Sequence, residues 1–182
     1  MEKLFRFTSY FIGLVAVAVL VQGVTQAKME KLQESGLTNV PDVVSIKTRE
    51  RQLDCMAMNI YREAGHEPFE GKVAVAQVTM NRVKDGRFGD DVCGVIFKKS
   101  VIMDKVVCQF SWACDSAAKA RPVNNAAYNE SYLVAKKVLL EGFTLSILKD
   151  ALYFHATHIN PQWPLEKIGT IGNHIFYKPK GK

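Results

Sequence analysis

The sequence lacks several features that would each indicate a class of protein. Its longest nearly apolar run, residues 10–21, falls short of the roughly 20 apolar residues that cross a bilayer comfortably. Lysine and arginine form no run longer than a pair, whereas nucleic-acid-binding proteins carry clustered basic stripes. No His-Glu-x-x-His motif occurs, and there is no internal repeat or low-complexity tract. These absences argue against a nucleic-acid partner, a zinc peptidase of the His-Glu-x-x-His type and a repeat array.

What the sequence does contain fits one globular domain with a short appendage. Its 182 residues are 48% apolar and 23% charged, which are the proportions of a folded protein. The formal net charge of +6 is dispersed along the chain. That charge suits attraction to an anionic polymer or surface of a bacterial envelope, and it equally suits ordinary solubility. Nothing in the sequence indicates a cofactor, and we expect a monomer.

Residues 1–27 have the pattern of a secretory signal. Lys3 and Arg6 give a positive start, residues 10–21 are apolar, and Ala27 ends a small and polar stretch at a candidate cleavage site. We therefore predict export to the periplasm or cell envelope. A cleaved signal peptide is favoured over an uncleaved anchor that would hold the chain transiently on the membrane.

Residues 28–48 are polar and are predicted to form a linker before a domain spanning residues 49–182. Apolar residues at helical spacing predict helices in this domain, at residues 49–63, 70–83 and 124–141. Aromatic segments bounded by turn residues predict strands at residues 151–156 and 174–177, and residues 84–94 are predicted to be a loop. The fold class is therefore α+β, mainly helical with a small antiparallel β element near the C-terminus.

The four cysteines, Cys55, Cys93, Cys108 and Cys114, gain a meaning from the predicted export. In an oxidising compartment they favour two disulfides. Four cysteines allow three pairings, and the sequence does not choose among them.

Glu63 is the sharpest chemical signal in the sequence. It continues the stripe formed by Leu53, Met56 and Ile60, so its carboxylate should face the core or a cleft. Burial and the adverse dipole at a helix C-terminus both raise a carboxyl pKa, and a glutamic acid protonated near neutral pH can donate to a glycosidic oxygen. The alternative is a glutamate at a helix end that turns to solvent. Glu67, at the start of the next helix, is expected to cap that helix instead.

Several ordered segments carry recognisable motifs, at residues 55–68, 71–83, 92–97, 108–115, 153–156, 160–163 and 171–177. The first reads Cys-Met-Ala-Met-Asn-Ile-Tyr-Arg-Glu-Ala-Gly-His-Glu-Pro, and the fourth reads Cys-Gln-Phe-Ser-Trp-Ala-Cys-Asp. Together they resemble the SleB-like family of spore-cortex-lytic cell-wall hydrolases, over about residues 51–178. The family usually reads Glu-Ala-Arg-Gly-Glu where this chain has Glu63-Ala64-Gly65-His66-Glu67, so the loop after the first glutamate is expected to differ.

The resemblance implies a lysozyme-related catalytic domain that acts on the glycan strands of peptidoglycan, with Glu63 as the catalytic glutamate. Such enzymes resemble lytic transglycosylases. One carboxyl group protonates the oxygen between N-acetylmuramic acid and N-acetylglucosamine, and the C6 hydroxyl of the muramic sugar then closes an anhydro ring. A hydrolytic muramidase is the alternative, and it would need a second carboxylate such as Asp115 or Asp150. An envelope enzyme and a phage lysis enzyme (endolysin) fit equally well.

Seven further residues are candidates for substrate binding: Gln109, Ser111, Trp112, Tyr153, His155, Asn160 and His174. Amide and hydroxyl groups can bond sugar hydroxyls, and indole rings can stack on sugar faces. Trp112 suits the core equally well, because tryptophan is often largely buried. For both histidines the alternative is a buried ring bonded to the backbone.

Three other functions stay open. His155, His158 and His174 would be the ligands of a zinc site, which needs three or four converging groups. Cys108 with His155 would be the nucleophile and base of a wall peptidase, which a disulfide at Cys108 would exclude. A wall-binding module without catalysis is the third, and it would have no use for an acid at Glu63.

Overall fold

The computed structural model describes residues 19, 21–24, 26–27 and 40–181. The chain divides into two units, Met1–Thr48 and Arg49–Lys182. Most of the predicted signal at residues 1–27, and residues 28–39 of the predicted linker, lie outside the described residues. In the part of the chain that is described, no helix combines the length and the apolarity needed to cross a membrane.

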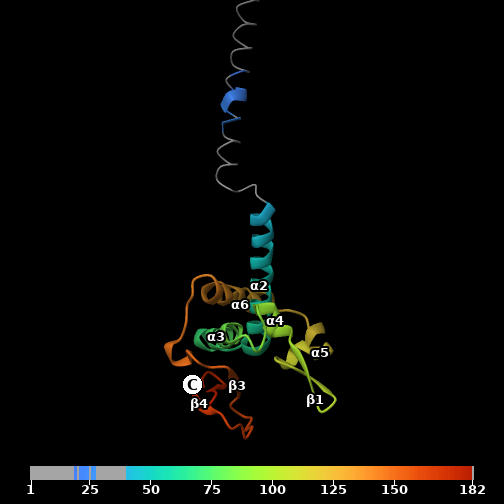
Figure 1. The fold of residues 1–182 in the computed structure, drawn as a ribbon, viewed down its shortest axis with the longest axis vertical. Helices are drawn as coiled ribbons and strands as arrows, with labels where there is room; N and C mark the ends of the chain where they lie inside the picture. Colours follow the sequence, from blue (N-terminus) through green and yellow to red (C-terminus); the bar gives the residue numbers. More distant parts are fainter. Residues whose placement is uncertain (1–18, 20, 25, 28–39, 182) are drawn as a thin grey trace, which may run out of the picture. The chain divides into compact units, whose positions relative to one another are not determined.

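Helix α2 (Val40–Ala64) ends next to Glu63, as predicted, but begins well before residue 49 (Figure 1). Residues 40–48 of the predicted linker are therefore helical. Pro41 favoured a linker in the sequence, yet it lies in the first helical turn, where the missing proline N–H has no partner to lose.

Helices α3 (Phe69–Asp85) and α6 (Asn125–Leu139) confirm the other two predicted helices. Gly86 ends α3 in a left-handed conformation at φ 76°, which glycine adopts readily. The Asn124 side chain caps α6 by accepting a hydrogen bond from the backbone N–H of Ala127. Helix α3 is buried along most of its length, which explains why apolar residues occur on more than one of its faces.

Several short elements escaped prediction: α4 (Val92–Phe97), α5 (Ser116–Ala120), the 3-10 turns η1 (Ser111–Ala113) and η2 (Ser146–Leu148), and strands β1 (Lys99–Ile102) and β2 (Lys105–Cys108). Helix α4 begins inside the predicted loop at residues 84–94, so the predicted C-terminal boundary of that loop is wrong. Asp91 caps α4 by accepting from the Gly94 N–H. The helix is too short for its apolar residues to show a period.

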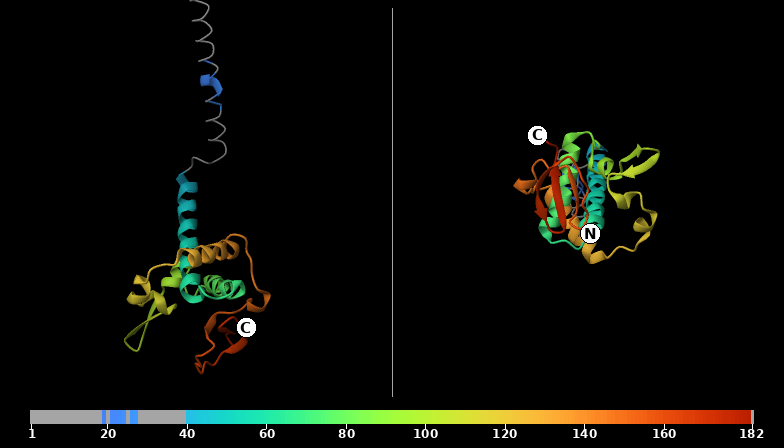
Figure 2. Two further views of the ribbon diagram at one scale, coloured as in Figure 1. Left: turned by 180° about the vertical axis from the view of Figure 1, so that it is seen from behind. Right: turned by 90° about the horizontal axis from the view of Figure 1, so that it is seen from below.

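The C-terminal sheet is antiparallel, with strand order β3-β5-β4. Strands β3 (Tyr153–Ala156) and β5 (His174–Lys178) confirm the two predicted strands, and β4 (Glu166–Ile171) was missed. The register of the β4–β5 pairing shifts between Lys167 and Gly169. Strand β4 therefore lacks the regular alternation of apolar and polar residues by which a sequence reveals a strand. Figure 2 shows this sheet lying over α3, and the helices with this small sheet confirm the α+β class.

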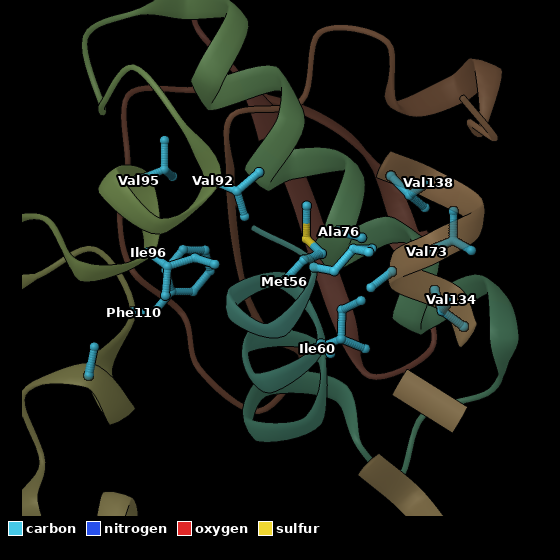
Figure 3. Close-up of a cluster of buried hydrophobic side chains, with 14 of the residues drawn as sticks. Met56, Ile60, Val73, Ala76, Val92, Val95, Ile96, Phe110, Val134 and Val138 are labelled. Carbon is cyan, nitrogen blue, oxygen red and sulfur yellow. The ribbon is translucent and has the colours of Figure 1, made fainter. Parts of the chain in front are cut away.

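The main core joins α2, α3, α4 and α6 (Figure 3). Leu53, Met56 and Ile60 are buried on α2, which confirms the stripe that leads to Glu63. A second cluster packs Phe176 of the C-terminal sheet against Ala74 and other residues of α3. The helical stripe therefore carries Glu63 directly to the border of the core.

Two disulfides pair all four cysteines of the sequence. Cys55–Cys93 joins α2 to α4, and Cys108–Cys114 joins the end of β2 to the residue after η1. The Cα atoms lie 5.4 Å and 5.8 Å apart, ordinary separations for disulfides. Because the Cys108 thiol is bonded, it cannot act as a nucleophile, and the cysteine peptidase interpretation is wrong.

Candidate functional site

A cavity of about 590 Å³ opens at the C-terminal end of α2. One wall is α2 and the turn that follows it, from Tyr61 to Glu67. The other wall comes from a segment far along the chain, with Ser111, Trp112 and Asp115 near η1 and then Ala118, Arg121 and Pro122. The cavity thus brings together three of the predicted site residues: Glu63, Ser111 and Trp112.

Glu63 is half-buried in this cavity. Burial raises the pKa of its carboxyl from 4.5 to about 7, because desolvation disfavours the charged form, and the nearby Arg82 cation opposes part of that rise. A substantial fraction of Glu63 therefore keeps its proton at neutral pH. An acid with this pKa, at the wall of an open cavity, can donate a proton to a bound leaving group and take one back.

Arg82 is the functional candidate that sequence reasoning missed. It is buried on α3, its Nε donates to the Leu152 carbonyl at 2.9 Å, and its guanidinium lies 5.2 Å and 5.0 Å from the ring centroids of Phe88 and Phe110. Burial lowers the Arg82 pKa to about 10, while Tyr153 and Glu63 act in the opposite direction. The sequence signals of Arg82 were a place in the motif at residues 71–83 and a position on the predicted helix there.

An Arg82→Gln substitution is expected to move the alkaline limb of activity to higher pH, because Glu63 then loses the cation that lowers its pKa. The lost hydrogen bond and ring contacts should also reduce the free energy of unfolding by about 2 to 3 kcal/mol. The measurement is the pH profile of kcat/KM, which reports groups of the free enzyme. Arg82→Lys should keep the limb in place.

Arg87→Gln is the matched control for this experiment. Arg87 also lies over Phe88, at 5.7 Å, but it is exposed and paired with Asp85. Its removal should leave the profile unchanged. An unmoved limb in Arg82→Gln would contradict the assigned role.

Trp112 is packed in the core and also lines the cavity, so its contact with a substrate stays a prediction. It is 7% exposed, its Nε1 donates to Asn59 Oδ1 at 2.9 Å, and Asn59 in turn donates to Thr79 at 3.3 Å. The indole is therefore held by a buried chain of hydrogen bonds to α2 and α3. Ser111, beside it on η1, is exposed at the cavity wall.

The remaining predicted residues lie elsewhere in the domain. Gln109 is half-buried between β2 and η1, and Asn160 is exposed in the loop after β3. Tyr153 and His155 lie on β3 and share contacts with the exposed Trp163. None of these lines the cavity around Glu63, so their contact with a substrate stays a prediction.

His155 is bonded as a buried histidine. Its Nδ1 lies 2.8 Å from the Ala156 carbonyl and its Nε2 lies 2.9 Å from the Tyr177 hydroxyl. A carbonyl can only accept, so Nδ1 donates and, in the neutral ring, Nε2 accepts from Tyr177. The His155 ring also stacks on Tyr177, and the Tyr177 ring contacts the exposed Trp163.

Glu67 does not cap α3, which corrects the predicted role. The N-cap residue of α3 is Pro68, which makes no side-chain capping hydrogen bond. Glu67 is instead buried and accepts from both the backbone N–H and the side-chain amide of Asn173, at 3.1 Å and 2.9 Å. It thereby ties the turn between β4 and β5 to the loop that follows Glu63.

His174 lies beside this junction, with its Nδ1 4.0 Å from Glu67 Oε1. Burial lowers the pKa of His174, and the Glu67 carboxylate acts against that shift. Its ring packs on Phe154 and Phe176 in the sheet. His174 is therefore linked to the cavity through Glu67, whose other side lines it.

Gly172→Ala should destabilise this junction strongly. Gly172 has φ 56°, and an added Cβ would lie 1.9 Å from Glu67 Oε2. Left-handed strain of about 1 kcal/mol and the loss of charged hydrogen bonds to Asn173 should together lower the free energy of unfolding by about 3 kcal/mol. Urea unfolding measures this change.

Gly142→Ala separates the two causes. Gly142 has φ 71°, but an added Cβ would meet no heavy atom within 4 Å, so only strain of about 1 kcal/mol is expected. An equal decrease in the free energy of unfolding in both variants would show that the contact with Glu67 adds nothing to the effect of Gly172→Ala.

The carboxylates proposed for a hydrolytic mechanism separate in space. Asp115 lines the cavity, and its Oδ1 accepts from the N–H groups of Ala117 and Ala118 at the start of α5. Asp150 lies in a different hollow, with Asn81 and Lys84.

Within the described part of the chain, no cluster of three or more histidine, cysteine, aspartate or glutamate side chains has the geometry to hold a metal ion.

The chain is similar to known proteins over most of this domain. A family described as Cell Wall Hydrolase matches residues 66–177. The spore cortex-lytic enzyme of Oceanobacillus iheyensis is 33% identical over 147 residues, which are 77% of this chain and 45% of that enzyme. The spore cortex-lytic enzyme of Bacillus cereus is 32% identical over 160 residues, 84% of this chain and 52% of that enzyme. The chain thus spans about half the length of these relatives.

Solved structures agree with the fold. The catalytic domain of the Bacillus cereus SleB protein superposes with a TM-score of 0.52 at 27% identity, covering 71% of this chain and 91% of that one. The catalytic domain of the germination-specific lytic transglycosylase SleB from Bacillus anthracis gives 0.51 at 31% identity, covering 70% and 93%. The resemblance read from the motifs is confirmed, and the chain belongs to the Cell Wall Hydrolase family.

Proposed function

We propose that this chain cleaves the glycan strands of peptidoglycan as a lytic transglycosylase, with Glu63 as its acid–base group. The observation that carries the proposal is a half-buried carboxyl at the wall of the cavity, with its pKa raised to about 7. Membership of the Cell Wall Hydrolase family supports the substrate class. The lytic transglycosylase from Bacillus anthracis supports the reaction type.

In this mechanism Glu63 first donates its proton to the oxygen between N-acetylmuramic acid and N-acetylglucosamine, and that bond breaks. The Glu63 carboxylate then accepts the proton of the muramic C6 hydroxyl while the oxygen of that hydroxyl attacks C1 and closes the anhydro ring. Glu63 ends the cycle protonated, so one carboxyl group suffices. A pKa near 7 suits both steps, because the group must release and recover one proton with similar ease.

Ser111 and Trp112 are proposed to bind the sugar on the wall facing Glu63, because both residues line the cavity there. Glu67 positions the loop after Glu63 through Asn173. We further propose that the domain at residues 49–182 carries the activity, and that the chain is exported to the cell envelope, where its substrate lies.

A hydrolytic muramidase is the second candidate, favoured by Asp115 at the same cavity. In that mechanism an aspartate in the cavity would orient the attacking water molecule. However, Asp115 Oδ1 is already engaged by two backbone N–H groups of α5, which leaves less of the carboxylate for that task.

Mass spectrometry of digested peptidoglycan distinguishes the two. Anhydro-muramic ends are expected from the transglycosylase, and reducing ends would assign the hydrolase. Digestion products cut only in the peptide stems would overturn both.

A further inference from the structure

The β1–β2 hairpin projects from the domain in each view (Figures 1 and 2). Its two strands pair only with each other. A hairpin of this size is marginal in water without other support. The support lies at its base, where the Gln109 N–H donates to the Lys98 carbonyl at 3.1 Å and the disulfide Cys108–Cys114 ties β2 to the cavity wall.

The outer half of the hairpin presents aliphatic side chains to water. Val101 and Val106 are cross-strand partners, so their side chains share one face, and they are 71% and 60% exposed. Met103, at the tip, is 91% exposed. Apolar side chains gathered on a projecting element mark a surface that meets a partner, because water disfavours them there.

The turn at the tip gives an independent sign of selection for something other than local stability. Met103 and Asp104 both have positive φ, 48° and 61°, as in the two-residue turns that favour asparagine and glycine. A methionine is strained in that conformation, and a side chain that is 91% exposed gains little from packing on the domain. Positions that break a local rule without a gain within the fold tend to serve function.

The charged residues of the hairpin indicate which kind of partner suits it. Lys99 and Lys105 are exposed on the two strands, and Asp104 is the one acid between them. Lysines on strand edges oppose pairing with a second copy of the chain. No aromatic residue that could stack on a sugar occurs between residues 99 and 108. An aliphatic tip flanked by lysines instead matches a membrane interface, where apolar groups enter the headgroup layer and lysines meet lipid phosphates.

We propose that the β1–β2 hairpin docks on an anionic lipid surface, with Val101, Met103 and Val106 in the headgroup layer. The Cys108–Cys114 disulfide would then transmit the orientation of the hairpin to Ser111 and Trp112, which lie between the bonded cysteines. Docking would thus hold the cavity close to the membrane surface. This inference is independent of the proposed cleavage reaction.

Amide hydrogen exchange of the full-length chain, read by mass spectrometry on peptides covering residues 99–108, tests the docking. The local readout is needed because the apolar run at residues 10–21 can itself bind vesicles. Phosphatidylglycerol vesicles should slow exchange of the hairpin amides by about tenfold, with far less effect from phosphatidylcholine vesicles. Each lysine at an anionic surface strengthens binding by about fivefold, so Lys99→Gln with Lys105→Gln should raise the vesicle concentration needed for half-maximal protection by about twentyfold at low salt.

Val101→Ser with Val106→Ser should abolish the protection while core peptides keep their slow exchange. Leu133→Ser is the matched control, since Leu133 is 61% exposed on α6, and it should keep the protection. Equal protection by both lipids, or none, would overturn the proposal. Protection by purified peptidoglycan in place of vesicles would reassign the hairpin to the glycan. Protection that rises with protein concentration alone would reassign it to self-association.

Discussion

Replacing Glu63 by Gln is expected to reduce peptidoglycan cleavage by roughly three orders of magnitude while leaving the fold intact. The amide fills the same space at the cavity wall, but it has no proton to give to the glycosidic oxygen and cannot accept one from the C6 hydroxyl. The measurement is release of soluble muropeptides from purified peptidoglycan, together with a binding assay on the same material. Binding should persist, because Ser111 and Trp112, the residues proposed to bind the sugar, are unchanged.

Glu70→Gln is the control for this substitution. Glu70 lies in the first turn of α3 and is exposed, so neutralising it removes the same charge outside the cavity. It should retain full activity. Activity close to that of the unmodified chain in Glu63→Gln would remove Glu63 from the chemistry and favour a binding module or a different acid.

The position of Glu63 was accessible to sequence reasoning because it depends on one helix. Leu53, Met56 and Ile60 define a face by spacing alone, and that face is buried. Any residue that continues the stripe at the helix end must come to the border of the core. The same local logic identified helices α3 and α6 and strands β3 and β5.

What the sequence did not reveal depends on contacts between distant segments. The wall opposite Glu63 comes from residues 111–122, and their approach to α2 has no periodic signal. Arg82 meets Phe88, Phe110 and Leu152, which three separate segments supply. The pairing of Cys55 with Cys93 likewise requires α4, a helix too short to predict.

The hairpin and the C-terminal sheet show a further limit. Strand β1 and strand β2 surround a Met-Asp turn, whereas sequence signals for hairpins depend on asparagine and glycine. Tyr153, His155 and His174 were predicted to bind substrate because they lie in aromatic segments flanked by turn residues. In the fold they gather on the sheet, and the link to Glu63 passes through Arg82 and Glu67.

Glu63→Gln should also make the chain more stable above pH 7, because the raised pKa of Glu63 is itself a cost of folding. The carboxyl has a pKa of about 7 in the folded chain against an ordinary value of 4.5. Below pH 4.5 it is protonated in both states and its ionisation has no effect on stability. Between these values the unfolded chain releases the proton first, so the free energy of unfolding falls as pH rises, by up to roughly 3 kcal/mol in all.

A glutamine does not ionise. The gap in free energy of unfolding between the variant and the unmodified chain should therefore open only as pH rises from 4.5 to about 7 and above. Urea unfolding at about pH 4 and about pH 8 should show near-equal stabilities at the lower pH and a more stable variant at the higher pH. Glu70→Gln, at an exposed position, should show no such opening. A gap of the same size at both pH values would assign the difference to packing and contradict the raised pKa. An opening gap, together with lost cleavage, would show that the acid needed for catalysis is held at the expense of stability.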